Sequence, residues 1–450
     1  MYKEYLKLHG AKTTEKHGPR VIKLLYISLI WFLFFQESCT TLKSGTIGPV
    51  RIETPLGFCH AGQTETDREY QLLDDLGCEW LRVDYHWNTI ERTQGEFDFQ
   101  STDQFAQAAL QHNKKILAVL CYDAAWMHDD KRKQPYIPPE YYDAFIRYVT
   151  ATVTRYKDQV SAFEIWNEPN LRFRFWGGSN EEFFELFKRT VNAIKSIDPT
   201  IIVTTPGICR GNDKYLQKMF EAGAMEHVDV ISFHPYAVTL PGYLKQIEQM
   251  QKKAQSFGFK GECWISEMGY PTGGLYPTRV SEDNLSARTV KTLVYGLAKN
   301  IRLITWYHLF DEEKRKKTNS EDFFGLVIRD KEYTYKKGAY AFRAIARNIS
   351  HSYLMNSKVK CNINGLQYYN FQQDNGNCLL VLWSENRHHK ISLSVPSLEC
   401  LQWSISSSNI KALSGSPLYI EIGKEPVVLT FNNKENAHDN IIIKDIKRKK

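Results

Sequence analysis

Between residue 55 and about residue 345, short apolar runs alternate with longer stretches in which apolar residues recur every three or four positions. The short runs are typical of buried parallel strands, and the longer stretches, such as 140–156 and 181–197, are typical of amphipathic helices. Eight such units within about 300 residues favour a closed (β/α)8 TIM barrel over an open sheet. The predicted strands are 56–60, 80–85, 115–122, 162–166, 201–207, 229–236, 263–269 and 302–309.

The pattern changes at about residue 351. From there to residue 436, short strand-like runs are separated by Asn/Gly or polar turns, and no long helical stretch occurs. This pattern predicts a small C-terminal β-sandwich. The chain therefore divides into a tether at 39–50, a barrel at 51–350, a β-sandwich at 351–436 and a basic tail at 437–450.

The N-terminal region resembles an export signal. Residues 24–35 (LLYISLIWFLFF) form an apolar run of 12 residues behind a basic stretch. A run of this length is too short for a membrane-spanning helix of about 20 residues but suits the apolar core of a signal peptide. Cys39 follows as in bacterial lipoprotein signals, although Gln36 and Glu37 replace the small or apolar residues usual there. We predict a signal peptide over 1–38 with lipid attachment at Cys39, or alternatively an uncleaved signal anchor. Either would place the chain in a bacterial cell envelope, as an outer-membrane lipoprotein or in the periplasm.

The net charge of +7 arises at the two ends of the chain. Residues 1–38 contain six basic and three acidic residues, and residues 441–450 contain five basic residues and one acidic residue. These two segments account for the whole excess, so the body between them is close to neutral. Because nucleic-acid binding relies on a basic surface, we predict no nucleic-acid partner.

The nine cysteines show no metal-binding spacing. None forms a C-x-x-C pair, so no zinc site is predicted, and we predict neither a metal nor an organic cofactor. Export would permit disulfides. Cys361, Cys378 and Cys400 lie near enough in the sequence for one, but the sequence does not choose a pairing.

Several predicted strands end in polar or aromatic residues that can perform chemistry. In a TIM barrel, active-site residues lie at the carboxyl ends of the strands. Glutamates follow the fourth strand and end the seventh, so they lie roughly across the barrel mouth, with room for a substrate between them. The residues at these strand ends are Arg82, Asn167, Glu168, His234, Tyr236, Glu267 and Trp306.

Two glutamates in this arrangement fit the hydrolysis of glycosidic bonds. One carboxyl group must donate a proton to the leaving oxygen, while the other must be ionised to attack the anomeric carbon, so their environments must differ. Arg82 is placed to hold Glu267 ionised by charge pairing, and Tyr236 is placed to donate a hydrogen bond to the same carboxylate. Asn167, beside Glu168, is suited to bind a sugar hydroxyl next to the reacting carbon.

Four motifs resemble those of the clan A glycoside hydrolases, which include families 39 and 5 and related bacterial β-glucanase families. The motifs are WLRV (80–83), IWNEP (165–169), FHPY (233–236) and ISEMG (265–269). The resemblance implies that Glu168 is the acid/base and that Glu267 is the nucleophile. The supporting residues that it implies are Arg82, His234, Tyr236 and Trp306.

One departure from the clan concerns the sugar-binding loops. Where some of these families place a histidine after the third strand, this chain has CYDAAW (121–126). The candidates for contacting the nonreducing sugar are therefore His60, Asp123 and Trp126. Trp306 offers a flat apolar face for the sugar ring. The aromatic residues that either form sugar platforms or pack inside the strand-end loops are Trp126, Trp176 and Tyr276.

The sequence thus predicts an exported, monomeric, retaining β-glycosidase that acts on β-linked carbohydrate by double displacement. This mechanism places the two carboxyl groups about 5–5.5 Å apart. Two alternatives use the same barrel, namely a glycan-binding protein without catalysis and a transglycosylase. The C-terminal β-sandwich would either bind sugar or, as we favour, pack against the barrel as a buttress.

Overall fold

The structure is a computed structural model. The residues that it describes are 51–59, 66–128, 134–312, 314–395, 397, 399–415, 417–432 and 441–446. The predicted signal peptide, the tether and the lipid attachment at Cys39 lie outside the described residues. Within the part that is described, no helix has both the length and the apolar composition needed to cross a bilayer.

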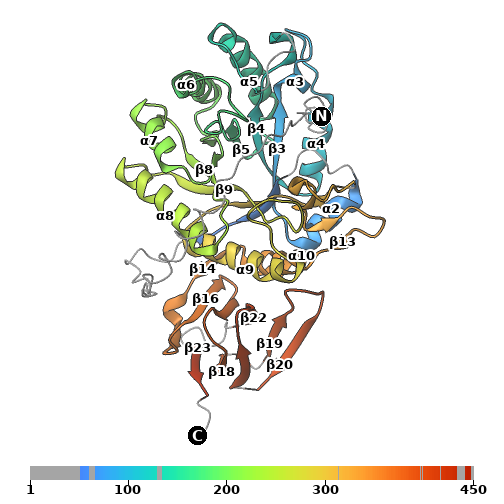
Figure 1. Cartoon of the computed structure of the whole chain (residues 1–450), viewed down its shortest axis with the longest axis vertical. Coiled ribbons are helices and arrows are strands. Elements are labelled where there is room, and N and C mark those ends of the chain that lie inside the picture. The colour runs from blue at the N-terminus through green and yellow to red at the C-terminus, as the bar shows by residue number, and fades with distance from the viewer. Residues whose placement is uncertain are drawn as a thin grey trace, which may run out of the picture. The chain divides into compact units, whose positions relative to one another are not determined.

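Eight parallel strands form the closed barrel that the sequence predicts (Figure 1). They are β2 (Leu56–Cys59), β3 (Trp80–His86), β4 (Lys115–Cys121), β5 (Ala162–Ile165), β6 (Val203–Thr204), β8 (Val230–His234), β9 (Glu262–Met268) and β10 (Ile304–Trp306). Neighbours pair in the order β6-β5-β4-β3-β2-β10-β9-β8, and β6 pairs with β8 to close the ring. The short strand β7 (Ile208–Cys209) adds to the end of β8.

Helices surround the barrel strands (Figure 1), and their apolar faces join the strands in one large core. The predicted helices at 140–156 and 181–197 are confirmed as α5 and α6. The helices are α2 (Asp67–Leu76), α3 (Trp87–Ile90), α4 (Gln100–Gln111), α5 (Tyr142–Tyr156), α6 (Asn180–Ile197), α7 (Asp213–Glu221), α8 (Leu240–Ser256), α9 (Glu282–Ala298) and α10 (Lys337–Ile349). Short 3-10 turns are η1 (Ala125–Met127), η2 (Pro139–Tyr141), η3 (Ser320–Phe323) and η4 (Asn356–Lys358).

Alternate residues of the barrel strands point inward and form layers, because successive side chains of a strand face opposite sides. Nearest the amino ends of the strands lies a buried apolar layer, which we call the plug. The plug consists of Trp80, Leu117, Ala162, Val230, Trp264 and Leu303. Two positions further along five of these strands lies a polar layer. It consists of Arg82, Glu164, Ser232, Ser266 and Thr305, all buried.

A β-bulge in β9 turns an additional side chain toward the barrel interior. Ile265 pairs with Ile304 and Met268 pairs with Trp306, so three residue steps on β9 match two on β10. Such an extra residue bends a strand and redirects its side chains. Ser266 and Glu267 are adjacent in sequence, yet both reach interior partners because of this bulge.

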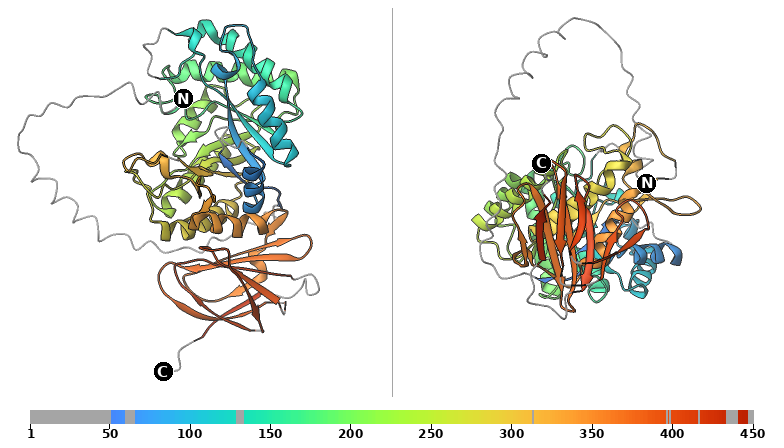
Figure 2. Two further views of the ribbon diagram at one scale, coloured as in Figure 1. Left: turned by 90° about the vertical axis from the view of Figure 1, so that its right-hand side faces the viewer. Right: turned by 90° about the horizontal axis from the view of Figure 1, so that it is seen from below.

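The C-terminal region contains two sheets, drawn mainly in orange and red in Figure 2. Their strands pair antiparallel except for the parallel pair β15 and β23. An apolar core contains side chains from both sheets. The larger sheet has the order β1-β14-β16-β17-β22-β19-β20 and the smaller sheet has the order β15-β23-β18-β21. The strands are β1 (Arg51–Ile52), β14 (Ser352–Leu354), β15 (Val359–Cys361), β16 (Leu366–Gln373), β17 (Asn377–Ser384), β18 (His389–Ser394), β19 (Glu399–Trp403), β20 (Ile410–Ser414), β21 (Leu418–Ile422), β22 (Val427–Asn432) and β23 (Ile441–Asp445). A separate small sheet after β10 joins β11 (Phe310–Asp311), β12 (Val327–Ile328) and β13 (Thr334–Tyr335).

Both ends of the described chain depart from the predicted boundaries. β1, assigned to the barrel from the sequence, pairs with β14 of the larger C-terminal sheet. The segment predicted as a basic tail contains β23, which pairs with β15 and β18. The tail prediction is wrong for these residues because Ile441 and Ile443 alternate toward the sandwich core and are 1% exposed. The prediction of a tail relied on the basic residues that follow and overlooked the alternation of buried and exposed residues at 441–445.

The C-terminal sheets contact α9 of the barrel. The Tyr295 ring lies edge-on to Trp383 at 5.3 Å and to Tyr369 at 5.9 Å between centroids. Lys291, also on α9, pairs with Glu385 at 2.8 Å. Trp383 is fully buried in this packing. These contacts agree with the favoured buttress role, which stays a prediction.

Every cysteine of the described residues is a free thiol. Cys378 and Cys400 each lie opposite Phe431, on the two strands that flank β22. Phe431 therefore lies between them in the sheet. Cys361 lies in the other sheet. The disulfide that export would permit among these three is not formed.

Candidate active site

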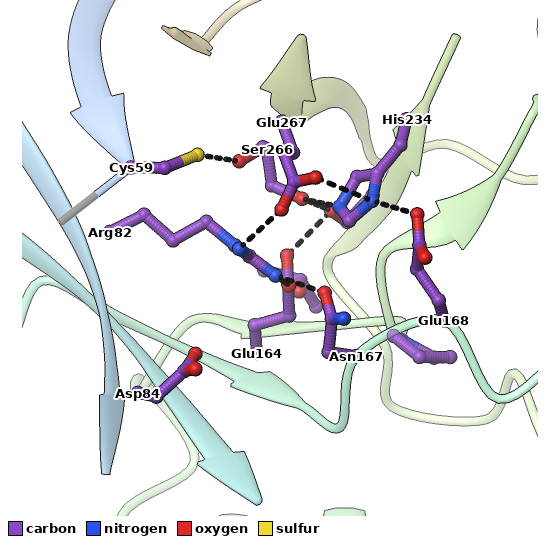
Figure 3. A network of polar contacts seen from close by, with 12 residues as sticks. Cys59, Arg82, Asp84, Glu164, Asn167, Glu168, His234, Ser266 and Glu267 are labelled. Carbon is purple, nitrogen blue, oxygen red and sulfur yellow. Dashed lines mark hydrogen bonds and ion pairs between the residues drawn. The ribbon is translucent and has the colours of Figure 1, made fainter. Parts of the chain in front are cut away.

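The carboxyl ends of four barrel strands bring five predicted residues together (Figure 3). Arg82 comes from β3, Asn167 and Glu168 follow β5, His234 ends β8 and Glu267 lies near the end of β9. Arg82 Nη1 donates to Glu267 Oε2 at 3.1 Å, and Arg82 Nη2 donates to Asn167 Oδ1 at 2.8 Å. His234 Nδ1 lies 2.8 Å from Glu168 Oε1.

The two glutamates are close neighbours with little exposure. Oxygen atoms of Glu168 and Glu267 and a ring nitrogen of His234 all lie within 4.8 Å of one another. The side chain of Glu168 is 8% exposed and that of Glu267 is 14% exposed. This nearest-atom separation is shorter than the roughly 6.5–9.5 Å between carboxyl groups that an inverting glycosidase needs for its water. It is closer to the roughly 5–5.5 Å spacing that a retaining mechanism uses.

An unusual backbone turn presents Glu168. β5 ends at Ile165, earlier than predicted, and the following residues leave the sheet. Trp166 has φ 71° and Glu168 has φ 49°, both in the left-handed region that non-glycine residues rarely adopt. The Glu168 N–H donates to Gly207 O at 3.0 Å, and Trp166 is fully buried. Strained backbone of this kind is common where a side chain must be presented for function.

Glu267 contacts both partners that the sequence predicts for it, Arg82 by charge pairing and Tyr236 by a hydrogen bond. Besides the bond from Arg82, Tyr236 Oη donates to Glu267 Oε1 at 2.9 Å. Arg82 itself is held from below, because its Nη2 donates to Glu164 Oε1 at 2.6 Å. Both donors to Glu267 favour the carboxylate form over the acid.

The two glutamates affect each other's ionisation. Burial raises the pKa of Glu267, although the charges of His234 and Arg82 oppose the rise, and the charge of Glu168 adds to it. Burial also favours the acid form of Glu168, but the hydrogen bond and the charge of His234 bring its pKa below the ordinary value. Two carboxyl groups this close share one proton. When Glu168 carries it, its raising effect on Glu267 disappears, and the donors from Arg82 and Tyr236 stabilise the Glu267 anion.

Trp306 does not face the site. It is fully buried, with 0% relative exposure, and its ring packs edge-on against Tyr270. Alternate side chains of β10 face the barrel interior, and Thr305 is one of them because its hydroxyl donates to Ser266 O. Trp306, one residue later, therefore faces the opposite side of the strand. The expectation that Trp306 offers a face to a sugar ring is therefore wrong. The neighbouring Tyr307 is partly exposed, and its hydroxyl donates to Glu321 Oε2 at 3.2 Å.

The loop residues considered for sugar contacts are largely engaged with the protein. Trp126 is partly buried, and its Nε1 donates to Glu91 O at 2.9 Å. Asp123 Oδ2 lies 2.7 Å from His128 Nε2 and accepts from the Tyr136 N–H. Trp176 is fully buried, so packing is its role. Tyr276 is partly exposed, and His60 lies outside the described residues.

Comparisons with known proteins point to glycoside hydrolases. A sequence model of Glycosyl hydrolases family 39 matches residues 138–259. A beta-xylosidase from Caldicellulosiruptor saccharolyticus is 33% identical over 210 residues, which is 41% of this chain and 43% of that protein. A beta-xylosidase from Geobacillus stearothermophilus is 34% identical over 114 residues, which is 23% of this chain and 22% of that protein. The chain thus matches less than half the length of these curated relatives.

Solved structures share the fold over most of their length. A family 39 glycoside hydrolase from Bacteroides cellulosilyticus WH2 has a TM-score of 0.67 and 18% identity, covering 84% of this chain and 80% of that one. A monomeric beta-xylosidase from Caulobacter crescentus CB15 has a TM-score of 0.63 and 15% identity, covering 85% and 97%. This chain has the fold of the clan A glycoside hydrolases. At these identities, the likeness to the solved structures concerns the fold alone.

Three polar residues of the barrel interior were missed by the sequence analysis. Glu164 accepts from Arg82, and Ser232 and Ser266 connect Glu164 to His234 by hydrogen bonds. The signal for Glu164 was present, because it is a single charge inside the buried run AFEIW. The two serines carry no such signal, since a small hydroxyl residue is common in any buried strand.

Two groups of described residues bring atoms that can bind metals within 4.8 Å of one another. The first group is Glu168, His234 and Glu267, and the second is Asp84, His86 and Cys121. In the first, Arg82 already supplies positive charge to Glu267, which weakens the case for a cation. In the second, burial raises the pKa of the Cys121 thiol well above its ordinary value, which opposes the thiolate that a metal needs. Neither donor set therefore favours a resident metal.

Proposed function

We propose that this protein is a retaining glycoside hydrolase that cleaves β-linked oligo- or polysaccharides. The observation that carries the proposal is the pair Glu168 and Glu267, which lie within 4.8 Å of each other in contrasting surroundings. Glu267 accepts hydrogen bonds from Arg82 and Tyr236, whereas Glu168 faces His234. The match to the family 39 model supports the same reaction class.

The reaction would proceed in two displacements. First, a Glu267 carboxylate oxygen attacks the anomeric carbon, and the bond to the leaving oxygen breaks as Glu168 gives that oxygen its proton. A glycosyl ester of Glu267 results. Glu168, now a carboxylate, then removes a proton from water, which attacks the anomeric carbon and releases Glu267. Asn167 Oδ1 is held by Arg82, so its amide nitrogen would donate to the hydroxyl next to the reacting carbon.

We propose β-xylosides as the first substrates to test, because both curated relatives are described as beta-xylosidases. We also propose that the protein acts as a monomer. A solved neighbour of the same fold is described as monomeric. Other β-linked glycans remain in the substrate class, since loops around the mouth decide the sugar that is accepted.

We propose, as a separate point, that the protein is exported and attached to lipid through Cys39. The support is the apolar run at 24–35 with a cysteine shortly after it. Labelling cells with a palmitate analogue tests the attachment. Label on the wild-type chain that is lost in Cys39→Ser supports it, and equal label or none in both chains contradicts it.

The central test compares wild type with Glu267→Gln on β-xylosides and a panel of β-glycans, with the product anomer followed by NMR from the first minutes. We expect the β-anomer to form first and the variant to lose turnover by about a thousandfold or more. Glu262→Gln is the matched control on the same strand, because Glu262 lies at the other end of β9 and its side chain is 49% exposed. A first-formed α-anomer would contradict retention. Glycan binding by both proteins without any turnover would favour a binding protein.

A further inference from the structure

A third carboxylate lies directly beneath the two catalytic candidates (Figure 3). Glu164 projects into the barrel from β5 and is 0% exposed. Its Oε1 accepts from Arg82 Nη2 at 2.6 Å and from Arg82 Nε at 3.1 Å. Two donors from a guanidinium hold Glu164 as an anion. An ionised carboxylate can only accept hydrogen bonds, so Glu164 fixes the direction of any hydrogen bond that reaches it.

A chain of buried hydroxyl groups leads from Glu164 to His234. Ser232 Oγ lies 2.6 Å from Glu164 Oε2 and 2.5 Å from Ser266 Oγ. Ser266 Oγ in turn lies 3.1 Å from His234 Nε2. Both serines and His234 are 0% exposed, so no bulk water reaches this chain. It ends at His234 Nδ1, which lies 2.8 Å from Glu168 Oε1.

The number of hydrogens decides the direction of each bond in this chain. A serine hydroxyl has one hydrogen. Because Glu164 cannot donate, Ser232 must give its hydrogen to Glu164. Ser266 must then give its own hydrogen to Ser232. With that hydrogen used, Ser266 can only accept from His234, so His234 Nε2 must carry a hydrogen.

We propose that Glu164 is a positioning residue that, through Ser232 and Ser266, keeps His234 protonated on Nε2 and so keeps the acid proton of the site in the His234–Glu168 hydrogen bond. The inference rests on the proposed function. A neutral imidazole protonated on Nε2 has a bare Nδ1, so the 2.8 Å contact requires a hydrogen from Glu168. If instead the proton moves to Nδ1, it stays within the same bond. In either form, one proton is available to the leaving oxygen.

The other groups that face this pair do not replace Glu164. The Cys209 thiol hydrogen-bonds Glu168, and the Arg174 and Arg210 charges lie near its carboxyl group. All three favour the Glu168 anion, which opposes its use as an acid. Glu267 Oε1 lies 3.9 Å from His234 Nδ1, too far for a hydrogen bond. The chain of hydroxyl groups from Glu164 is therefore the feature that keeps a proton in the hydrogen bond between His234 and Glu168.

The substitution Glu164→Gln tests the proposal with little change of shape. A glutamine amide can donate to Ser232, which permits the chain to reverse. Ser232 would then donate to Ser266, Ser266 to His234 Nε2, and an Nδ1 hydrogen would hold Glu168 as a carboxylate. The acid proton would be lost, while Glu267 would keep its bonds from Arg82 and Tyr236.

The kinetic readout compares two leaving groups in wild type and Glu164→Gln. Phenyl β-xyloside needs an acid to leave, whereas 2,4-dinitrophenyl β-xyloside leaves without one. We expect kcat/KM for the phenyl substrate to fall about a hundredfold, the size of an acid-catalysis term, and the dinitrophenyl value to fall less than tenfold. An equal loss on both substrates would overturn the proposal, because it would mean that Glu164 acts only by holding Arg82 against Glu267.

A second readout needs neither turnover nor a stable Glu164 variant. In wild-type protein labelled with 15N-histidine, the His234 resonances are identified by their loss in His234→Gln. We expect a hydrogen on His234 Nε2 throughout the active pH range, and a bare Nε2 would overturn the proposal. Ser266→Ala breaks the chain but keeps the Arg82–Glu164 pair, so it should show the same dependence on leaving group. If wild type cleaves neither xyloside, the proposed substrate fails, and the nitrogen shifts still decide the role of Glu164.

Discussion

The barrel interior changes character between its two inner layers. At the amino ends of the strands, the plug is apolar, and Trp80 and Trp264 meet edge to face with ring centroids 5.5 Å apart. Two positions further along, the same alternation carries a buried network built on Arg82 and Glu164. The plug offers only packing, whereas every group of the polar layer has a partner in the site. Stability and chemistry are thus assigned to different levels of the same strands.

This division explains why a buried ion pair is tolerated inside the barrel. Taking Arg82 and Glu164 out of water costs free energy, which their mutual attraction repays only with good geometry and further hydrogen bonds. Arg82 makes contacts to Glu164, Asn167 and Glu267, and Glu164 has an additional donor in Ser232. The plug beneath closes the barrel, so the network needs to position reacting groups rather than hold the fold together.

The largest expected effect comes from removing the acid in the upper level. Glu168→Ala should lower kcat for phenyl β-xyloside by about a hundred- to ten-thousandfold, because the leaving oxygen loses its proton donor. Added azide, which needs no base to attack the glycosyl ester, should restore part of the turnover of 2,4-dinitrophenyl β-xyloside. Release of phenol and dinitrophenol measures both rates. A variant that cleaves phenyl β-xyloside at the wild-type rate would remove Glu168 from the mechanism.

The plug should respond to substitution in the opposite way. Trp264→Ala removes a buried indole and should lower the free energy of unfolding by about 3–5 kcal/mol. Urea unfolding followed by fluorescence measures the loss, and Trp264→Phe is the milder control. At a temperature where the variant is still folded, kcat/KM should stay within a few-fold of wild type. A thousandfold loss in the folded variant would show that the two levels are not separable.

The sequence predicted the barrel well because its strands are short, largely apolar runs that alternate with amphipathic helical stretches. It also placed Arg82, His234, Glu168 and Glu267 at one mouth, since the carboxyl ends of all barrel strands meet there. The connections beneath them were beyond a linear pattern. Glu164 acts through Ser232 and Ser266, which lie 68 and 102 positions away in the chain and become neighbours only when the barrel closes.

Two errors had local causes. Trp306 was assigned to the site because it stands near a strand end, but a one-residue change of parity sends a side chain to the opposite face of a sheet. Thr305 faces inward, so Trp306 faces the helices. The tail at 437–450 was judged by its charge, and the strand Ile441–Asp445 inside it was missed. Parity read from the inward neighbours would have corrected the first error.

Separate substitutions of Trp306, the last residue of β10, and of Tyr307, the residue after it, test which of the two side chains faces the site. Tyr307 is partly exposed beside the site, so Tyr307→Ala should raise KM for xylosides about tenfold, the loss of roughly 1.4 kcal/mol of ring contact. Trp306→Phe, in the fully buried position, should lower the melting temperature and leave KM within twofold. Kinetics and thermal unfolding of the two variants decide the matter. A raised KM in Trp306→Phe with Tyr307→Ala unchanged would restore the original assignment.

The smallest expected effect is a shift of the pH profile. Glu267 must be ionised to attack, and burial raises its pKa above the ordinary value of 4.5 although Arg82 opposes the rise. Activity should therefore fall tenfold per pH unit below a raised acid limit, where Glu267 becomes protonated. Arg82→Lys keeps the charge but cannot reproduce the three-way contact, so the limit should move to higher pH by up to about one unit, equivalent to 1.4 kcal/mol. The pH dependence of kcat/KM measures the limit, and Arg302→Lys, whose side chain pairs with Glu262 at the amino end of β9, is the control. An unchanged limit in Arg82→Lys would mean that Arg82 serves Glu164 alone, and the upper level would then be divided between support and catalysis.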